Sequence, residues 1–239
     1  MEVIMCLDSE DISRKAAELF VRLAGESISS HGRFAVALSG GSTPKILYSR
    51  LAGIPDIPWS GIHLFWGDER CVPPDHRDSN YRMTREALLD QAPIPESNIH
   101  RIRGEGSNPE QAALDYEQEI RKVFGTGDGW PRFDLVFLGM GDDGHTASLF
   151  PGTSALKGTD RLVVSNYVEK FLAHRITFTA PLINHAAHIA FLISGASKAS
   201  PLKEVLHGTR QPDVYPSQLI QPVNGELTLF VDHPAAKLL

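Results

Sequence analysis

The sequence predicts an α/β fold in which a parallel sheet is covered by helices on both faces. Short runs that are apolar throughout alternate with segments of helical spacing, which is typical of parallel strands buried on both faces. Four of these runs are followed directly by polar or glycine-rich segments. Composition gives no sharp boundary, so we interpret residues 1–239 as a single domain with a small additional lobe from about residue 150 to 180.

The predicted helices rest on apolar spacing and on residues that begin helices. Asp8 or Ser9 is a suitable cap for the first helix, whose apolar residues recur at helical spacing up to Leu23. The second helix begins at Pro44 with Thr43 as its cap, and a later one begins at Pro109, because proline suits the first helical position. We expect helices over residues 9–23, 44–51, 81–89, 109–124 and 199–206.

The predicted strands are short apolar runs bounded by glycine, proline or charged residues. We expect a loop over residues 71–80, which are rich in proline and aspartate, and a turn-rich link over residues 125–131. We expect strands over residues 34–38, 62–66, 134–138, 162–164, 176–179, 187–193 and 227–231.

The bulk composition excludes several classes of protein. Hydrophobic residues make up 42% and charged residues 22% of the chain, and the net charge is −6 with no run of basic residues. This pattern argues against nucleic-acid binding and against a polybasic membrane patch. No basic, apolar leader begins the chain and no apolar run approaches the ~18 residues of a membrane span, so we expect a cytoplasmic protein. With only Cys6 and Cys71, we expect no disulfide.

Polar segments that follow parallel strands converge on one edge of a sheet, where α/β proteins bind ligands. Ser39-Gly40-Gly41-Ser42-Thr43 joins a predicted strand to a predicted helix. The glycines let the backbone approach a ligand, while the hydroxyls and the helix N-terminus supply donors to an anion. We interpret this segment as binding phosphate or sugar, with a tight capped turn as the alternative.

A second polar segment, 67–70, follows the strand at residues 62–66. Its charges Asp68 and Arg70 either face solvent at a sheet edge or point into the crevice, where Arg70 could pair with an anion. Asp78-Ser79-Asn80 either forms a polar wall of the same crevice or only caps the next helix. The residues alone leave both alternatives open.

The segment 139–145 carries the strongest signal, because three glycines surround two aspartates and a histidine directly after a buried strand. The ordinary pKa of histidine, about 6.5, lets His145 accept a proton from water near neutral pH. Asp143 lies two residues earlier and could orient the imidazole or stabilise its charged form. We interpret the pair as catalytic rather than as part of an aspartate-rich turn.

Two cations complete the candidate site, and no metal is expected. Arg175 precedes a predicted strand and Lys198 follows Ser194-Gly195; each is either a solvated charge or a phosphate contact. The cluster of His145 with Asp142 and Asp143 lacks the second histidine that a compact zinc site would want. The remaining strand-associated histidines are interpreted as structural: His63, His185 and His188.

At these residues the sequence resembles the 6-phosphogluconolactonase family, within the wider superfamily of glucosamine-6-phosphate isomerases/deaminases. The resemblance spans nearly the whole chain and rests on the segments 38–44, 66–73, 78–81, 138–152, 175–177 and 195–198. It implies a modified Rossmann-like fold and hydrolysis of 6-phospho-D-glucono-1,5-lactone without a cofactor. It also implies His145 as general base, Asp143 as its partner and Arg70 near the reacting carbonyl. The implied substrate and phosphate contacts are Ser42, Thr43, Arg175 and Lys198.

The deaminase branch is the main alternative function. Its members carry Phe-Asn-Glu-Pro after Asp-Gly-His, with a glutamate that acts in ring opening, whereas Phe150 holds the corresponding position here. This departure favours the lactonase. A non-catalytic sugar-phosphate sensor is the second alternative. We expect a small-molecule sugar phosphate as the partner, with no nucleic acid or membrane, and a monomer or weak homodimer.

Overall fold

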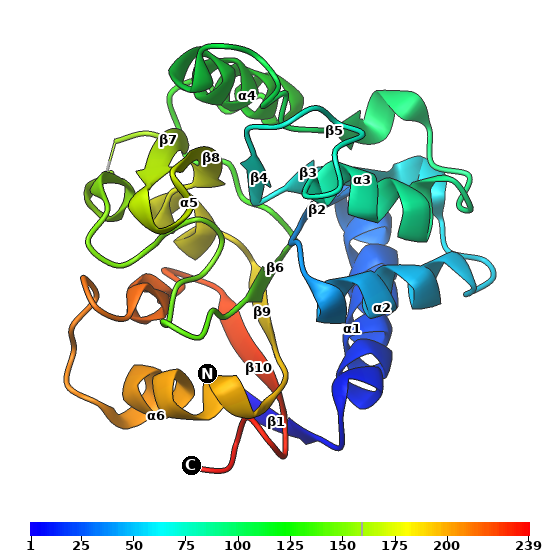
Figure 1. Cartoon of the computed structure of the whole chain (residues 1–239). Coiled ribbons are helices and arrows are strands. Elements are labelled where there is room, and N and C mark those ends of the chain that lie inside the picture. Colours follow the sequence, from blue (N-terminus) through cyan, green and yellow to red (C-terminus); the bar gives the residue numbers. More distant parts are fainter. Residues whose placement is uncertain (159) are drawn as a thin grey trace.

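A seven-stranded parallel sheet forms the centre of the computed structural model, which describes residues 1–158 and 160–239 (Figure 1). Every pairing within this sheet is parallel, as the apolar runs predict. Its strands lie in the order β1 (Glu2–Cys6), β10 (Glu226–Asp232), β9 (His188–Ile193), β6 (Leu135–Gly139), β2 (Phe34–Leu38), β3 (Ile62–Trp66) and β5 (Ile99–His100).

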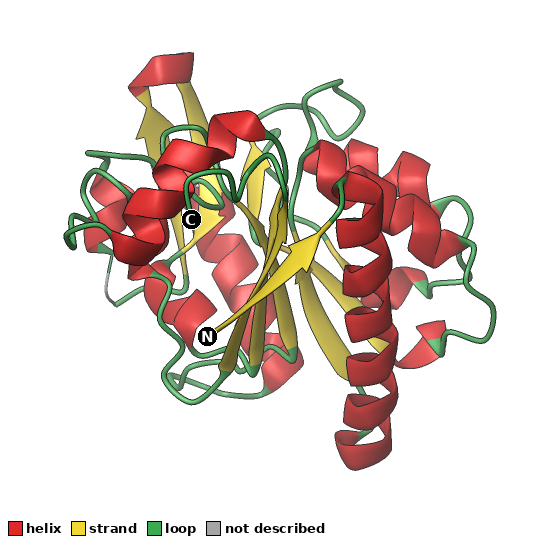
Figure 2. Cartoon of the chain, turned by 90° about the horizontal axis from the view of Figure 1, so that it is seen from below, coloured by secondary structure: helices red, strands yellow, loops and turns green. Residues whose placement is uncertain are grey.

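Helices cover both faces of the sheet, so that the strands stand between two layers (Figure 2). The long helix α1 and helix α2 pack against each other on one face, and α5 and α6 lie on the other (Figure 1). The α-helices are α1 (Ser9–His31), α2 (Ser42–Ala52), α3 (Asn80–Thr84), α4 (Pro109–Phe124), α5 (Ala180–Asn184) and α6 (Ala199–His207). This arrangement confirms the predicted fold class.

A second, three-stranded antiparallel sheet lies beside the main one, in the order β4 (Asp68–Arg70), β8 (Ala173–Phe178) and β7 (Val163–Val168). The predicted lobe at residues 150–180 supplies only two of its strands. Its third strand, β4, comes from the charged segment 67–70, for which the sequence predicts no strand. The three charges of β4 are consecutive and have no apolar alternation, so period-based prediction had nothing to detect.

Several boundaries differ from the prediction. The strands β1 and β5 and the short helix α5 were not predicted, and the helix at 81–89 begins at Asn80 and turns π-helical over Arg85–Leu89. Thr43 is not a helix cap, because α2 begins one residue earlier and Gly41 occupies the cap position without a side-chain hydrogen bond. Asp8 does cap α1, accepting a hydrogen bond from the Asp11 amide.

The core is the layer of apolar side chains between the central strands and their helices. β2 is buried along its whole length, and the ring of Phe20 on α1 packs against the rings of Phe34 and Phe137 in the sheet. Both cysteines are free thiols, and Cys6 is buried at the end of β1. Among the described residues, no helix is long and apolar enough to cross a membrane.

Candidate functional site

The topology brings the four predicted polar segments to one edge of the main sheet. The chain moves from β2 to β3 and β5 in one direction, then returns to place β6 on the other side of β2. The boundary between β2 and β6 is therefore the switch point, the place where α/β proteins bind ligands. The segments after β2 and β6 flank this boundary, and those after β3 and β9 lie one strand further out.

The histidine and aspartate after β6 form a direct pair. Nδ1 of His145 is hydrogen-bonded to Oδ1 of Asp143, and the same oxygen accepts the His145 backbone amide at 3.2 Å. An ionised carboxylate can only accept, so Nδ1 is the donor in this hydrogen bond. In a neutral imidazole Nε2 then carries the lone pair, and Nε2 has no hydrogen-bond partner among the described residues. This nitrogen is free to accept a proton from a bound water.

The Asp143 carboxylate is held in its ionised form. Burial alone would raise its pKa, but the hydrogen bond and charge of His145 and a further hydrogen bond from Lys170 outweigh burial and hold the pKa of Asp143 well below its usual range. The Lys170 Nζ lies 3.1 Å from Oδ2 of Asp143. The side chains of His145 and Asp143 are 23% and 27% exposed, so the pair is reachable from solvent.

Glycines make this pair possible. A Cβ on Gly141 would lie 2.0 Å from Nδ1 of His145 and 2.6 Å from Oδ1 of Asp143, which no side chain can tolerate. Gly144 has φ of +75°, in the left-handed region that favours glycine, and its added Cβ would meet the Tyr215 ring at 2.8 Å. The glycine density noted in the sequence therefore has two specific causes, close packing and a left-handed turn.

Phe150 stacks on the imidazole of His145. The Phe150 ring lies 4.0 Å from the His145 ring, centroid to centroid, with an angle of 26° between their planes. Phe150 is buried, and it places an apolar face where the related motif would place a carboxylate. The stack fixes the plane of the imidazole and supplies no second proton-transfer group.

The glycine-rich turn after β2 packs against Asn80. A Cβ on Gly40 would overlap the Asn80 side chain at 1.9 Å, so glycine is required for this close approach. Gly41 has φ of +114° and precedes the first turn of α2. The Ser42 and Thr43 hydroxyls make no hydrogen bonds among the described residues, which leaves them and the helix N-terminus available to an anion.

Asp68 and Asn80 lie together in a buried network. Nδ2 of Asn80 donates to the Asp68 carbonyl at 2.9 Å and lies 3.3 Å from Oδ1, and the Ser148 hydroxyl donates to Oδ2 at 2.6 Å. Asp68 is 8% exposed and Asn80 1%. The network links the segments after β2, β3 and β6 through Gly40, Asp68 and Ser148. These contacts hold the three loops in fixed relative positions.

Sequence reasoning missed the role of Glu69. Its carboxylate accepts the backbone amides of Arg70, Asn80 and Tyr81, each at 2.8 Å, and the Ser79 hydroxyl at 3.0 Å. Burial raises its pKa, and the amide hydrogen bonds oppose that effect. All four partners are donors, so the carboxylate is the form this loop is built around. The clue in the sequence was a glutamate between two charged neighbours, which reads equally well as surface.

Two arginines stand side by side on the second sheet. Arg70 on β4 is the direct register partner of Arg175 on β8. Burial, followed by the nearby charge of Arg70, lowers the pKa of Arg175. Arg70 donates to the Asp78 carbonyl, and neither guanidinium forms an ion pair within the described part of the chain. Two adjacent cations without carboxylate partners are suited to binding an anion.

The remaining predicted residues lie at the expected edge without direct contacts. Lys198 follows β9 and is half-buried, and its ammonium makes no hydrogen bond or ion pair among the described residues. Ser39 is buried and its hydroxyl has no partner, while its backbone is bonded to the Tyr48 hydroxyl. Over residues 1–158 and 160–239, no group of three histidine, cysteine or acidic side chains is placed to hold a metal ion.

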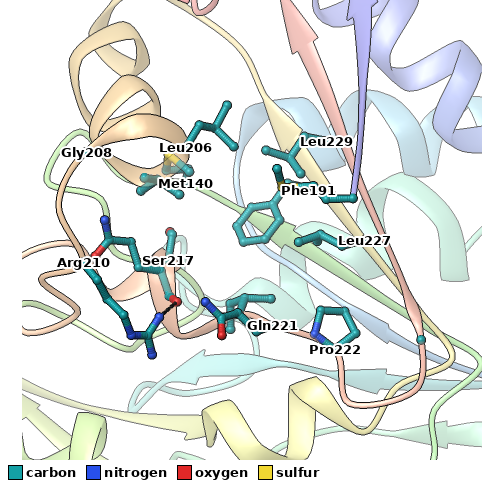
Figure 3. Close-up of a pocket in the computed structure, with 15 residues that line it drawn as sticks. Met140, Phe191, Leu206, Gly208, Arg210, Ser217, Gln221, Pro222, Leu227 and Leu229 are labelled. Atoms are coloured by element: carbon teal, nitrogen blue, oxygen red, sulfur yellow. Dashed lines mark hydrogen bonds between the residues drawn. The ribbon is translucent and has the colours of Figure 1, made fainter.

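A cavity of about 470 Å³ is lined in part by Met140, which belongs to the segment 139–145 after β6 (Figure 3). None of the predicted site residues lines it. Met140 lies next to Leu206 of α6 in its wall (Figure 3). Ser217 on the same wall donates its amide and its hydroxyl to the Gly144 carbonyl, at 2.9 and 2.8 Å. Ser217 therefore ties the wall of this cavity to the segment 139–145.

Comparison with known proteins places the chain in a family. The family model described as glucosamine-6-phosphate isomerases/6-phosphogluconolactonase matches residues 7–229. The chain belongs to this family. A 6-phosphogluconolactonase of Synechocystis is 49% identical over 215 residues, which cover 90% of this chain and 88% of that protein. A 6-phosphogluconolactonase of Nostoc is 44% identical and covers 95% of this chain and 94% of that protein.

Solved structures of family members share the fold. The 6-phosphogluconolactonase from Trypanosoma cruzi superimposes with a TM-score of 0.90 at 32% identity, covering 100% of this chain and 96% of that chain. A monomeric glucosamine-6-phosphate deaminase superimposes with a TM-score of 0.84, covering the whole of both chains, at 23% identity. The second likeness establishes a common fold and does not separate the two activities.

Proposed function

We propose that this chain hydrolyses 6-phospho-D-glucono-1,5-lactone to 6-phospho-D-gluconate, the lactone-opening step of the oxidative pentose phosphate pathway. Its curated relatives at 49% and 44% identity are 6-phosphogluconolactonases, which supports the reaction. The observation that carries the proposal is the Asp143–His145 pair with a free Nε2, stacked on Phe150 rather than on a second carboxylate.

His145 acts as the general base. Nε2 takes a proton from a water, whose oxygen attacks the lactone carbonyl carbon. The bond from that carbon to the ring oxygen then breaks, and the imidazolium returns its proton to the departing ring oxygen. Asp143 orients the imidazole through Nδ1 and stabilises the transient imidazolium. The product acid ionises at neutral pH and releases one proton to the medium.

Arg70 and the backbone amides of the glycine-rich loops stabilise the negative charge on the carbonyl oxygen. Removing one such donor typically costs about 3 kcal/mol of barrier. Arg175 and Lys198 hold the phosphate together with the first turn of α2, which provides the Ser42 and Thr43 hydroxyls. The walls that bind the sugar ring are formed by Ser39, Gly40, Gly41, Asp68 and Asn80.

Proton release from freshly prepared lactone tests the reaction, with a no-enzyme trace subtracted for spontaneous opening. We expect fast release with the wild-type chain and near-background release with His145→Ala. Ammonia release from glucosamine 6-phosphate would instead establish the deaminase. Tight binding of a sugar phosphate with no turnover of either compound would establish the sensor.

The remaining parts of the proposal concern the setting of the enzyme. The chain acts as one domain over residues 1–239, in the cytoplasm, as a monomer or weak homodimer, and without a metal or cofactor. Light scattering over a range of protein concentrations tests the oligomeric state. Assay after extensive chelation tests the metal-free reaction, which predicts unchanged kcat/KM.

A further inference from the structure

The tip of the β7–β8 hairpin, in the second sheet, contacts residues that follow β6 of the main sheet. β7 ends at Val168, a short 3-10 turn covers Glu169–Phe171, and β8 begins at Ala173. Leu172 closes the turn with φ of +49°, its amide bonded to the Glu169 carbonyl at 3.1 Å. A leucine rarely adopts this left-handed conformation, so the tip has a defined turn geometry rather than that of an irregular loop.

Two side chains of this tip contact the residues around His145. The Phe171 ring packs edge-on against Phe150 at 5.7 Å, and Phe150 in turn stacks on the imidazole. Lys170 lies with Nζ 3.1 Å from Oδ2 of Asp143 and 3.6 Å from Oδ1 of Asp142. The tip therefore contacts the pair in two ways: Phe171 reaches His145 through Phe150, and Lys170 binds Asp143 directly.

The ammonium and the imidazole occupy different oxygens of the same carboxylate. Oδ1 of Asp143 receives His145, and Oδ2 receives Lys170. With both oxygens engaged, the carboxylate cannot rotate without losing a charge-assisted hydrogen bond. Without Lys170, Oδ2 would face only solvent, and the orientation of Asp143 toward the imidazole would be less restricted.

Two cations lie near the pair, Lys170 on the hairpin tip and Arg175 on β8. The Arg175 guanidinium lies over the Phe171 ring at 5.3 Å. Of the two, only Lys170 is hydrogen-bonded to the Asp143 carboxylate.

We propose that Lys170 is a positioning residue for the Asp143–His145 pair: it fixes the Asp143 carboxylate, which in turn orients the imidazole. The inference rests on the proposed lactonase function. Lys170 does not touch the reacting atoms in this proposal; it acts through Asp143. In the sequence, Glu169-Lys170 reads as a pair of solvated surface charges, so only the fold brings this lysine to the site.

The test compares Lys170→Met with Lys170→Arg. We expect Lys170→Met to lower kcat about tenfold with KM changed less than about twofold, because orientation is lost rather than substrate binding. Lys170→Arg restores most of kcat.

Lys15→Met is the matched control, since Lys15 also pairs with an aspartate, Asp11, at 3.5 Å on the remote surface of α1. It leaves the kinetic constants unchanged. A rise in KM at constant kcat for Lys170→Met would overturn the inference in favour of simple attraction of an anionic substrate. Unchanged kinetics would overturn it outright.

The wild-type rate in the same assay separates the two proposals. A wild-type chain that fails to open the lactone contradicts the lactonase function itself. A wild-type chain that opens the lactone as fast as Lys170→Met contradicts only the role of Lys170. The Nδ1 proton resonance of His145 offers a readout without substrate, and we expect Lys170→Met to shift it and Lys15→Met to leave it in place.

Discussion

Two histidine–carboxylate pairs in this molecule have similar chemistry and opposite character. His145 bonds Asp143 through Nδ1, and His100 bonds Glu119 through Nδ1 at 2.9 Å. The difference lies at the other ring nitrogen. Nε2 of His100 is bonded to Nδ1 of His63 at 3.0 Å, whereas Nε2 of His145 has no partner among the described residues.

Their surroundings differ in the same sense. His100 lies in β5, its side chain is 6% exposed, and its ring is stacked on Phe65 at 4.4 Å. His145 is 23% exposed at the carboxyl end of β6. A histidine beside a carboxylate is therefore not enough for proposing a general base. The two histidines differ in that His145 has a free second ring nitrogen that solvent can reach.

The largest expected effect is a direct test of that contrast. Replacing each histidine with phenylalanine keeps a ring in place and removes the nitrogens. His145→Phe should lower kcat by about 10³-fold, since a positioned general base contributes roughly 10²–10⁴. His100→Phe should stay within about twofold of wild type. Steady-state proton release measures both, and similar losses in the two variants would refute the distinction.

Substitution of the two carboxylates, Asp143 and Glu119, tests the same contrast, with a somewhat smaller expected loss of kcat. Asp143→Asn should lower kcat by roughly 10²-fold or more, because an amide presents a donor as well as an acceptor and no longer fixes the imidazole tautomer. Glu119→Gln makes the same change beside His100 and should leave kcat near wild type. A Glu119→Gln loss as large as that of Asp143→Asn would mean that the core pair takes part in catalysis.

The sequence predicts that Asp143 and His145 act as a pair, and the structure places their side chains in contact, but the sequence does not predict what surrounds them. The three glycines around Asp143 and His145 lie within one short segment, 139–145, so the pattern can be recognised from the sequence alone. The contact of Lys170 with Asp143 joins residues 27 positions apart across two sheets, and no periodicity encodes it. The parallel sheet was predictable from apolar runs, while β4 was not, because its residues are charged and buried only through tertiary contacts.

Glycine substitutions test how closely the backbone packs against the side chains of Asp143 and His145. Gly141→Ala should lower kcat about tenfold or more, because the new Cβ would lie 2.0 Å from Nδ1 of His145 and must displace the pair. Gly139→Ala is the matched control two residues earlier, where an added Cβ meets nothing within 4 Å. Equal kinetic constants for Gly141→Ala and Gly139→Ala would show that the loop moves freely to accommodate a methyl group.

The smallest expected effect concerns the free energy of unfolding and involves the two neighbouring core histidines, His63 and His100. Burial lowers the pKa of His100 and, with the nearby charge of His100, that of His63. In the unfolded chain both histidines take up protons near pH 6.5, so the unfolded state binds more protons than the folded state just below that value. The free energy of unfolding therefore rises with pH in this window.

The stabilisation is fully present above about pH 6.5 and is lost as pH falls toward the lower folded-state pKa values. Thermal unfolding of wild type and His100→Phe between pH 7.5 and 5 measures it. We expect the wild-type midpoint to fall more steeply with acid than that of His100→Phe, in which one titrating group is absent and the other has lost its neighbour. Parallel midpoints in the two proteins would show that the surroundings of His63 and His100 do not oppose their protonation. Burial would then not distinguish these two histidines from His145.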